Sequence, residues 1–176
     1  GDGRIDLRAS ISKDNGHTWE APFTIVKGKG RGFDVFHTGF GDPCVVADRN
    51  SSRVFLLSCA GNVSFPGGTR EKHQGIAIMH SEDNGKTWGD IFTLIEGKGA
   101  DSPDFMNVAY GDPCIAVDRE SGRIMVMSCA GNIPYIKGQR DYHQCIARFY
   151  SDDNGKTWSA PVDISESIYS QFDNGK

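Results

Sequence analysis

One polar octapeptide occurs three times, and its residue types could either bind a cation or form a turn. It reads SKDNGHTW, SEDNGKTW and SDDNGKTW, beginning at positions 12, 81 and 151. Its Ser, Asp and Asn side chains carry the oxygen ligands that Ca²⁺ prefers. An EF-hand loop with Gly85 or Gly155 at its sixth position would begin at His80 or Tyr150. Neither residue can ligate calcium as the required first-position Asp does, so the octapeptide predicts no metal site.

A strand-to-strand turn accounts for the octapeptide better. Asn-Gly tolerates positive φ and suits a tight hairpin. The Asp and Ser side chains can accept hydrogen bonds from backbone N–H groups of the turn, and Trp supplies a large apolar anchor between neighbouring sheets. The positions that recur are Ser12, Asp14, Gly16, Thr18 and Trp19; Ser81, Asp83, Gly85, Thr87 and Trp88; and Ser151, Asp153, Gly155, Thr157 and Trp158.

Other charged residues could contact a substrate. Asp42 and Asp112 each precede a proline at the start of an expected strand, where a carboxylate could line a cavity or fix the strand entry. Arg70 and Arg140 could present guanidinium groups to an anion, or could pair with neighbouring acidic residues. Further polar candidates are Arg31, Asn62, Asn132, His73, His143 and Tyr135.

The five cysteines form two pairs and a single residue. Cys44 and Cys59 lie 15 residues apart, as do Cys114 and Cys129, whereas Cys145 stands alone. Each pair brackets an expected β-hairpin that would bring its cysteines close to opposite each other. Both cross-strand disulfides and buried free thiols fit this arrangement, and we expect free thiols. No pair has zinc-ribbon spacing, so we expect neither a metal site nor a cofactor.

The octapeptides belong to a longer repeat. Residues 41–62 align with 111–132, and residues 68–88 align with 138–158. One repeat of about 70 residues predicts four strands, at Pro43–Asp48, Arg53–Ala60, His73–Ser81 and Asp90–Glu96. Ile5–Ser12 and the segment APFTIV predict two more strands near the beginning, and no stretch predicts a capped amphipathic helix. Four strands per repeat predict an all-β propeller built of four-stranded antiparallel blades, whereas a two-sheet sandwich would not explain the period.

The repeat divides the chain into about two and a half blades. We expect the outer half of a blade at 1–27, full blades at 28–96 and 97–165, and a link toward a next blade at 166–176. A closed ring needs at least four blades. The chain is therefore expected to be a segment of a larger propeller, or to self-associate through exposed blade edges.

Composition excludes some partners. A net charge of −4 argues against nucleic acid or an anionic membrane as the main partner. No apolar run approaches the roughly 20 residues that cross a bilayer. The opening GDGRIDLR is not a signal peptide.

The three octapeptides resemble the Asp-box, Ser/Thr-x-Asp-x-Gly-x-Thr-Trp, of sialidases (neuraminidases) and related propeller proteins. Together with GRIDLRASISKDNGHTWEAP, GDPCVVAD and DNGKTWSAPVDIS, they make nearly the whole chain similar to the early blades of six-bladed bacterial exo-α-sialidases. This resemblance implies hydrolysis of terminal sialic acid from a sialylated glycan and a secreted or periplasmic location. It also implies that substrate binds over the propeller axis on the top face, opposite the Asp-box turns.

The family's catalytic set is expected to lie mostly outside this chain. Sialidases bind the substrate carboxylate with three arginines and use a Tyr nucleophile paired with Glu, together with an Asp acid/base. The family's Phe/Tyr-Arg-Ile-Pro motif is absent, and Asp2 lies only near the place of the acid/base. This chain alone is therefore expected to be inactive. Two alternatives remain: a non-catalytic Asp-box propeller that binds glycan or protein, and a repeat scaffold made by duplication or engineering.

Overall fold

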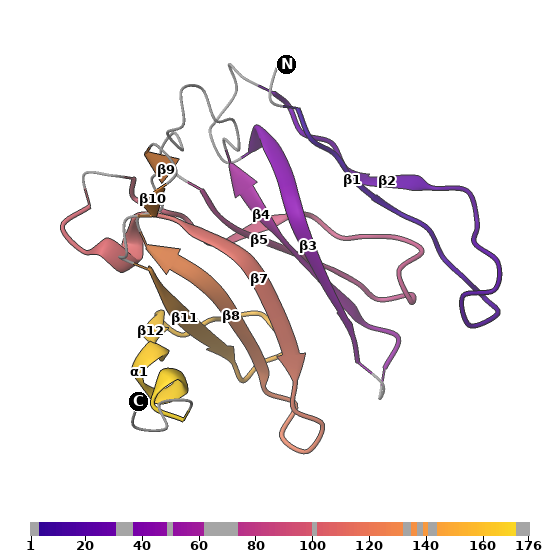
Figure 1. The fold of residues 1–176 in the computed structure, drawn as a ribbon. Helices are drawn as coiled ribbons and strands as arrows, with labels where there is room; N and C mark the ends of the chain where they lie inside the picture. Colours follow the sequence, from indigo (N-terminus) through magenta and orange to yellow (C-terminus); the bar gives the residue numbers. More distant parts are fainter. Residues whose placement is uncertain are drawn as a thin grey trace.

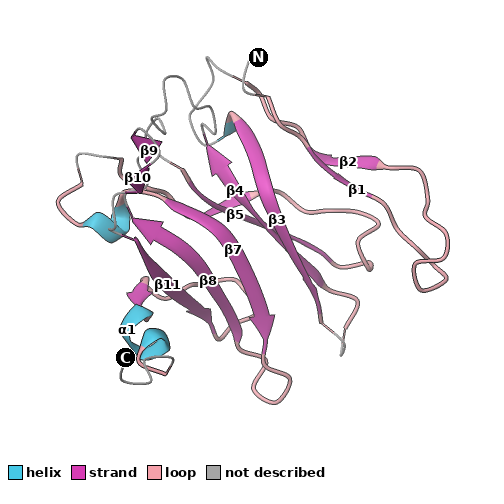
Figure 2. Ribbon diagram, viewed as in Figure 1, coloured by secondary structure: helices cyan, strands magenta, loops and turns pink. Residues whose placement is uncertain are grey.

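The computed structural model describes residues 4–30, 37–48, 51–61, 74–99, 102–131, 135–136, 139–140 and 144–171. Antiparallel sheets make up most of this part of the chain, and its main sheets lie side by side in chain order (Figure 1). Helix is confined to short segments (Figure 2). The prediction of an all-β chain built of four-stranded antiparallel blades is thus confirmed, and the described part has the form of a partial propeller.

The sheets follow the sequence repeat. The first holds β1 (Leu7–Ala9) and β2 (Phe23–Val26). The middle sheet holds, in spatial order, β3 (Gly39–Ala47), β4 (Val54–Gly61), β5 (Gly75–Ser81) and β6 (Phe92–Ile95). The last sheet holds β7 (Tyr110–Val117), β8 (Ile124–Gly131), β11 (Gln144–Ser151) and β12 (Val162–Asp163). A small separate sheet pairs β9 (Tyr135–Ile136) with β10 (Gln139–Arg140).

Two details differ from the sequence expectation. The strand expected at Pro43–Asp48 begins four residues earlier, at Gly39, because Gly39–Gly41 pairs with β4 although it lacks an alternating apolar pattern. Two short helical segments also form, η3 (Phe105–Asn107) and α1 (Ser165–Tyr169). The Asp104 side chain caps η3 by accepting a hydrogen bond from the Met106 N–H.

Strands β4 and β5 contribute buried side chains on both faces of the middle sheet. Successive side chains of a strand point to opposite faces, so Leu56 packs toward the first sheet and Leu57 toward the last. Fully buried strands of this kind read as nearly continuous apolar runs, as VFLLSCAG does. Two apolar clusters result, one on each side of the middle sheet.

The larger cluster joins the middle and last sheets. Its buried members are Phe55, Leu57, Cys59, Ile76, Ile78, Tyr110, Ile124, Val126, Ala130, Cys145, Ala147 and Phe149. The smaller cluster joins the first and middle sheets through Leu7, Phe40, Leu56, Ala60, Ala77 and Met79. Consecutive sheets are therefore held together by apolar packing, as blades of a propeller are.

None of the five cysteines forms a disulfide. The hairpin does not set Cys44 opposite Cys59, because the strand pairing shifts at an irregularity between Gly41 and Cys44. Cys59 instead faces Gly41, and Cys44 faces Leu57. The two cysteines of each pair are therefore offset along their strands, and the expectation that they would lie close to opposite each other is wrong. Among the described residues, no helix is long and apolar enough to cross a membrane.

Candidate functional site

Asp42 and Asp112 occupy equivalent bulges in the innermost strands of their sheets. Pairing shifts between Gly41 and Cys44 in β3, and between Gly111 and Cys114 in β7. Both aspartates have a φ of 47°, in the left-handed region that non-glycine residues rarely adopt. Each is exposed. The expectation that they stand at the start of their strands is therefore wrong: they lie within strands that begin earlier, and the bulge turns them out of the ladder.

A serine of the second strand braces each bulge. The Ser58 hydroxyl donates to the Gly41 carbonyl at 2.7 Å. The Ser128 hydroxyl donates to the Gly111 carbonyl at 2.8 Å, and its oxygen lies 3.2 Å from the Gly111 N–H. Since both serines are buried, these bonds are shielded from water. The backbone beside each aspartate is thereby held in one conformation, a condition for precise substrate contact.

A thiol contacts the second bulge from the neighbouring sheet. The backbone N–H of Asp112 donates to the Sγ atom of Cys59 at 3.2 Å. Burial raises the pKa of the Cys59 thiol to about 12, and the Asp42 carboxylate adds to the rise. Cys59 therefore keeps its proton at neutral pH, and it pairs with Gly41 beside the first bulge while its sulfur contacts the second.

The structure describes less of the other candidate residues. Arg140 lies in β10 and Tyr135 in β9, which pair with each other in the small sheet. Arg70 lies outside the described residues. So do Asp2, Arg31, Asn62, His73, Asn132 and His143. Among the four charged candidates, the structure therefore relates Asp42 and Asp112 to each other, whereas the side chains of Arg70 and Arg140 lie outside its description.

Each Asp-box forms the same closed turn. In the middle sheet, Asp83 accepts hydrogen bonds from the Thr87 N–H at 2.8 Å and from the Thr87 hydroxyl at 2.7 Å. Ser81 donates to Asp83 at 2.8 Å and accepts from the Gly85 N–H at 2.8 Å. The Trp88 indole N–H donates to the Gly85 carbonyl at 3.1 Å. The other two boxes repeat these bonds within 0.1 Å.

These bonds explain the charge of the turn. The Thr87 backbone N–H and hydroxyl lower the pKa of Asp83 to about 2. The Thr157 hydroxyl and N–H lower the pKa of Asp153 to about 2 in the same way. An acid/base catalyst working near neutral pH needs a pKa close to 7. The Asp-box carboxylates are thus suited to holding a turn and unsuited to proton transfer.

The tryptophans of the boxes differ in environment. Trp88 packs against the cluster between the first and middle sheets, and Trp158 against the cluster between the middle and last sheets. Each therefore anchors its own sheet to the preceding one. Trp19 belongs to the first sheet, and 64% of it is exposed. The expected inter-sheet anchor is thus absent at Trp19 within the described residues.

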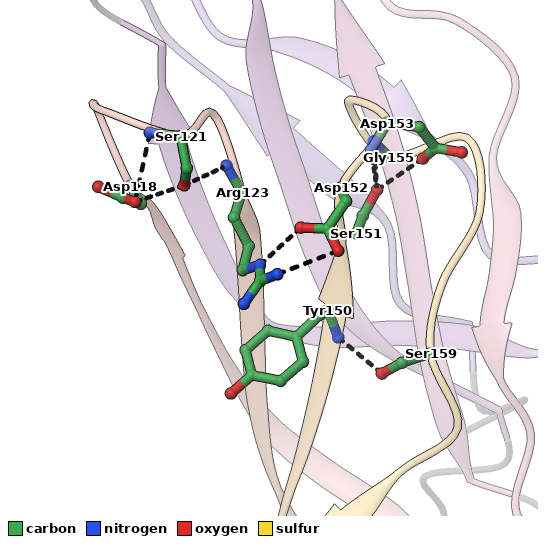
Figure 3. A network of polar contacts seen from close by, with 9 residues as sticks. All are labelled: Asp118, Ser121, Arg123, Tyr150, Ser151, Asp152, Asp153, Gly155 and Ser159. Carbon is green, nitrogen blue, oxygen red and sulfur yellow. Dashed lines mark hydrogen bonds and ion pairs between the residues drawn. The ribbon is translucent and has the colours of Figure 1, made fainter.

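The Asp-box turns share a face with the first hairpin of each sheet. Arg123, at the start of β8, contacts Asp152 of the box through two hydrogen bonds, of 2.5 and 3.2 Å, and its guanidinium lies 5.0 Å from the ring centre of Tyr150 (Figure 3). Arg53 and Glu82 repeat the pairing in the middle sheet at 2.7 Å. The Asn84 N–H also donates to the Ser52 carbonyl at 2.8 Å. The bulges lie at the opposite ends of the innermost strands.

This lower face offers little room for a ligand. A hollow of about 70 Å³ lies between the middle and last sheets, well below the roughly 300 Å³ at which small-molecule sites begin. It is lined by Asp48, Arg53, Phe55, Val117, Asp118, Arg119, Gly122, Ile124 and Asn154. In the part of the chain that the structure covers, no group of three or more His, Cys, Asp or Glu side chains could hold a metal ion.

Sequence reasoning missed the supports of the bulges. The segment SCAGN, which carries Ser58 and Cys59 in one repeat and Ser128 and Cys129 in the other, recurs with GDP at constant spacing. That joint recurrence is the signal that could have linked the second strand to the aspartates. A bulge, however, adds an unpaired residue, and no alternation pattern marks one in GFGDPC.

Comparisons with known proteins agree with this architecture. The BNR/Asp-box repeat family matches residues 149–160. A sialidase of Clostridium perfringens is 25% identical over 164 residues, covering 88% of this chain and 40% of that protein. A sialidase of Bacteroides fragilis is 30% identical over 110 residues, covering 56% of this chain and 20% of that protein. The resemblance to the sialidase family is thereby confirmed at the level of sequence.

Solved structures support the fold. The Hadza microbial sialidase Hz136 superposes with a TM-score of 0.56 and 22% identity, over 73% of this chain and 26% of that chain. An α-L-arabinofuranosidase of Fusarium graminearum superposes with a TM-score of 0.57 and 18% identity, over 90% of this chain and 40% of that chain. The chain thus spans 20–40% of the length of these curated sialidases and has the fold of part of a glycosidase β-propeller.

Proposed function

We propose that this sialidase-like Asp-box chain forms part of the propeller of an exo-α-sialidase, which hydrolyses terminal sialic acid from glycans. The chain would supply scaffold and one part of the substrate face, and the rest of a six-bladed propeller would supply most of the catalytic set. The observation that carries the proposal is the pair of braced aspartate bulges, set at the opposite end of the sheets from the Asp-boxes. The similarity to bacterial sialidases supports the choice of substrate.

Asp42 and Asp112 are proposed as acceptors for the hydroxyl and amide groups of the sugar. An ionised carboxylate accepts short, strong hydrogen bonds from such donors. Both residues are exposed, and their backbone is held by buried serines. Arg70 and Arg140 are proposed as partners for the carboxylate of sialic acid, because a guanidinium binds a carboxylate through two parallel hydrogen bonds.

The location and partners follow from the same proposal. An enzyme acting on glycans displayed by cells or mucus meets its substrate outside the cytoplasm. We therefore expect a secreted or periplasmic protein whose partner is a sialylated glycan. Nucleic acid and membrane are not expected as partners, given the net charge of −4.

The test is release of 4-methylumbelliferone from its α-sialoside by the polypeptide that the complete gene encodes. Asp42→Asn is expected to lower kcat/KM roughly 10- to 100-fold, since a hydrogen bond to a charged group contributes about 1.5–3 kcal/mol. Asp112→Asn is expected to act in the same direction. Glu82→Gln, which changes the lower-face ion pair with Arg53, is the matched control and should stay within about twofold of the parent.

Two results would contradict the proposal. Equal activity of Asp42→Asn and Glu82→Gln would remove the aspartates from the substrate face. Binding of sialyllactose without any release of sialic acid, measured by calorimetry on the same preparations, would instead favour the non-catalytic glycan-binding propeller.

A further inference from the structure

Consecutive residues of β4 support two different bulges. Ser58 faces its own innermost strand and donates to the Gly41 carbonyl at 2.7 Å. Cys59, the next residue, points to the other side of the strand, into the cluster between the middle and last sheets. It is fully buried, and its Sγ atom accepts the Asp112 N–H across the sheet interface at 3.2 Å. One strand thus contacts the bulges of two neighbouring sheets.

The second bulge needs such contacts. A non-glycine residue at a φ of 47° is strained, and such strain persists only where the surroundings enforce it. Ser128 holds the residue before Asp112 from within the last sheet. Cys59 holds the Asp112 N–H from the middle sheet. The conformation of Asp112 therefore depends on the packing of one sheet against the other.

Cys59 also lies beside the first bulge, because it pairs with Gly41, the residue before Asp42. Asp42 is among the groups that raise the pKa of Cys59, after burial, whereas the Asp112 N–H and the Gln74 side chain act in the opposite direction. A protonated thiol beside a carboxylate can donate its hydrogen to it, and a sulfur beside N–H groups accepts from them. Gln74 is 3% exposed, and its Oε1 atom is buried without a hydrogen-bond partner among the described residues. The backbone carbonyl of Gln74 accepts the Tyr110 N–H of the last sheet at 3.1 Å, which ties this residue to the same sheet interface.

We propose that Cys59 is a positioning residue that couples the two bulges and so sets the relative placement of the Asp42 and Asp112 carboxylates. Cys59 pairs with Gly41, next to Asp42, in its own sheet, and its thiol accepts the Asp112 N–H of the next sheet. This role rests on the proposed function, in which both aspartates contact substrate. Cys59 itself is fully buried and does not touch the sugar.

The first test follows the coupling directly, through amide hydrogen exchange of Asp112 measured by NMR on this chain. Cys59→Ala removes the acceptor and should speed exchange of the Asp112 amide roughly 3- to 10-fold, as expected for one lost hydrogen bond. Cys59→Ser keeps an acceptor and donor and should restore most of the protection. Cys145→Ala removes a thiol that is 4% exposed in the same apolar cluster and has no hydrogen bond to either bulge among the described residues; it should leave the Asp112 amide unchanged.

The second test measures the consequence for substrate, with the α-sialoside assay on the complete protein. Cys59→Ala should raise KM roughly 3- to 10-fold with a smaller change in kcat, and Cys59→Ser should rescue it. Cys145→Ala reports what loss of a buried thiol in the same cluster does without contact to either bulge among the described residues. The positioning role predicts that only the Cys59→Ala variant shifts KM and that serine reverses the shift.

The outcomes separate this inference from the function on which it rests. Unchanged exchange of the Asp112 amide in Cys59→Ala overturns the inference, whatever the activity. If Cys59→Ala speeds exchange of the Asp112 amide but has the same KM and kcat as Cys145→Ala, the proposed effect of Cys59 on substrate binding is overturned. If the parent protein neither hydrolyses the sialoside nor binds N-acetylneuraminic acid, the proposed function and the substrate role fail together, while the exchange data still decide whether the thiol couples the bulges.

Discussion

The Asp-box aspartate shows how one side chain can hold a turn. Its two oxygens accept the N–H and the hydroxyl of the threonine four residues later, and they also contact the serine two residues earlier. Between these partners, Asn84 and Gly85 both adopt positive φ, of 59° and 82°. Two consecutive left-handed residues are what Asn-Gly tolerates best. The turn thus uses the Ser, Asp, Asn, Gly and Thr that recur in all three octapeptides.

Acid should weaken this turn. Because the pKa of folded Asp83 is about 2, below the value of about 3.9 in an unfolded chain, its carboxylate stabilises the fold above pH 4. That stabilisation is lost as the pH falls from about 4 toward 2. Asp83→Asn should therefore have a lower urea midpoint than the parent at pH 6. The difference between the two midpoints should be smaller at pH 3. Thr87→Val removes the hydroxyl donor and keeps the N–H, so its urea midpoint at pH 6 should lie between those of the parent and Asp83→Asn. Parallel midpoint-against-pH curves for parent and Asp83→Asn would contradict this account.

Among the structural elements, the Asp-box turns of the middle and last sheets have the same backbone conformation but different surroundings. Gly85 and Gly155 have nearly the same φ, 82° and 83°. A Cβ added at Gly85 would meet the Trp88 ring at 3.7 Å, whereas at Gly155 it would meet the Phe55 ring at 3.2 Å. The Asp-box turn of the last sheet therefore packs against the middle sheet more tightly than local geometry requires.

Alanine substitutions should separate backbone strain from this packing. Gly122→Ala, at a φ of 73° with nothing within 4 Å of its Cβ, should cost about 1–2 kcal/mol through strain alone. Gly85→Ala should cost a similar amount, and Gly155→Ala should cost more because the Phe55 ring must move. Adding Phe55→Leu to Gly155→Ala should show a favourable coupling in a double-mutant cycle followed by urea unfolding. Equal costs at Gly85 and Gly155 would rule out the steric contribution.

At the scale of the whole molecule, the described sheets form an open series. The middle sheet is covered on both faces, while the first and last sheets each have one covered face. Trp19 on the first sheet and Val162 on the last are 64% and 48% exposed. On the last sheet, Arg148 lies 4.4 Å from the Tyr150 ring centre, and its Nε atom is buried without a partner among the described residues.

We expect this chain, studied alone, to self-associate through its open sheets. An outer strand with exposed apolar residues favours pairing with another chain, and a lysine there opposes it. Val162→Lys should therefore weaken the association seen by sedimentation velocity over a concentration series. Phe92→Lys is the matched control, because Phe92 pairs with Ile78 as Val162 pairs with Arg148 and is 38% exposed, but belongs to the sheet that is packed on both faces. A parent chain that stays monomeric at every concentration would contradict this expectation.

Short-range interactions of this protein could be predicted from its amino-acid sequence. The Asp-box bonds join residues two to four positions apart, so their chemistry can be read from eight letters. The repeat period and the apolar strands likewise predict four-stranded blades, and the octapeptide indicates the family. The early start of β3 escaped prediction because Gly39–Gly41 has no alternating pattern, although it pairs with β4.

The support of the two aspartates depends on long-range contacts that the sequence does not reveal. The bond between Asp112 and Cys59 joins residues 53 positions apart, across two sheets that meet only after the chain has folded. The left-handed φ of Asp42 and Asp112 depends on register shifts in paired strands, which neither strand specifies alone. Along the chain, Cys44 and Cys59 are possible partners in a cross-strand disulfide. They form none, because the bulge offsets Cys44 from Cys59. Long-range pairing and packing, rather than local propensity, set these positions.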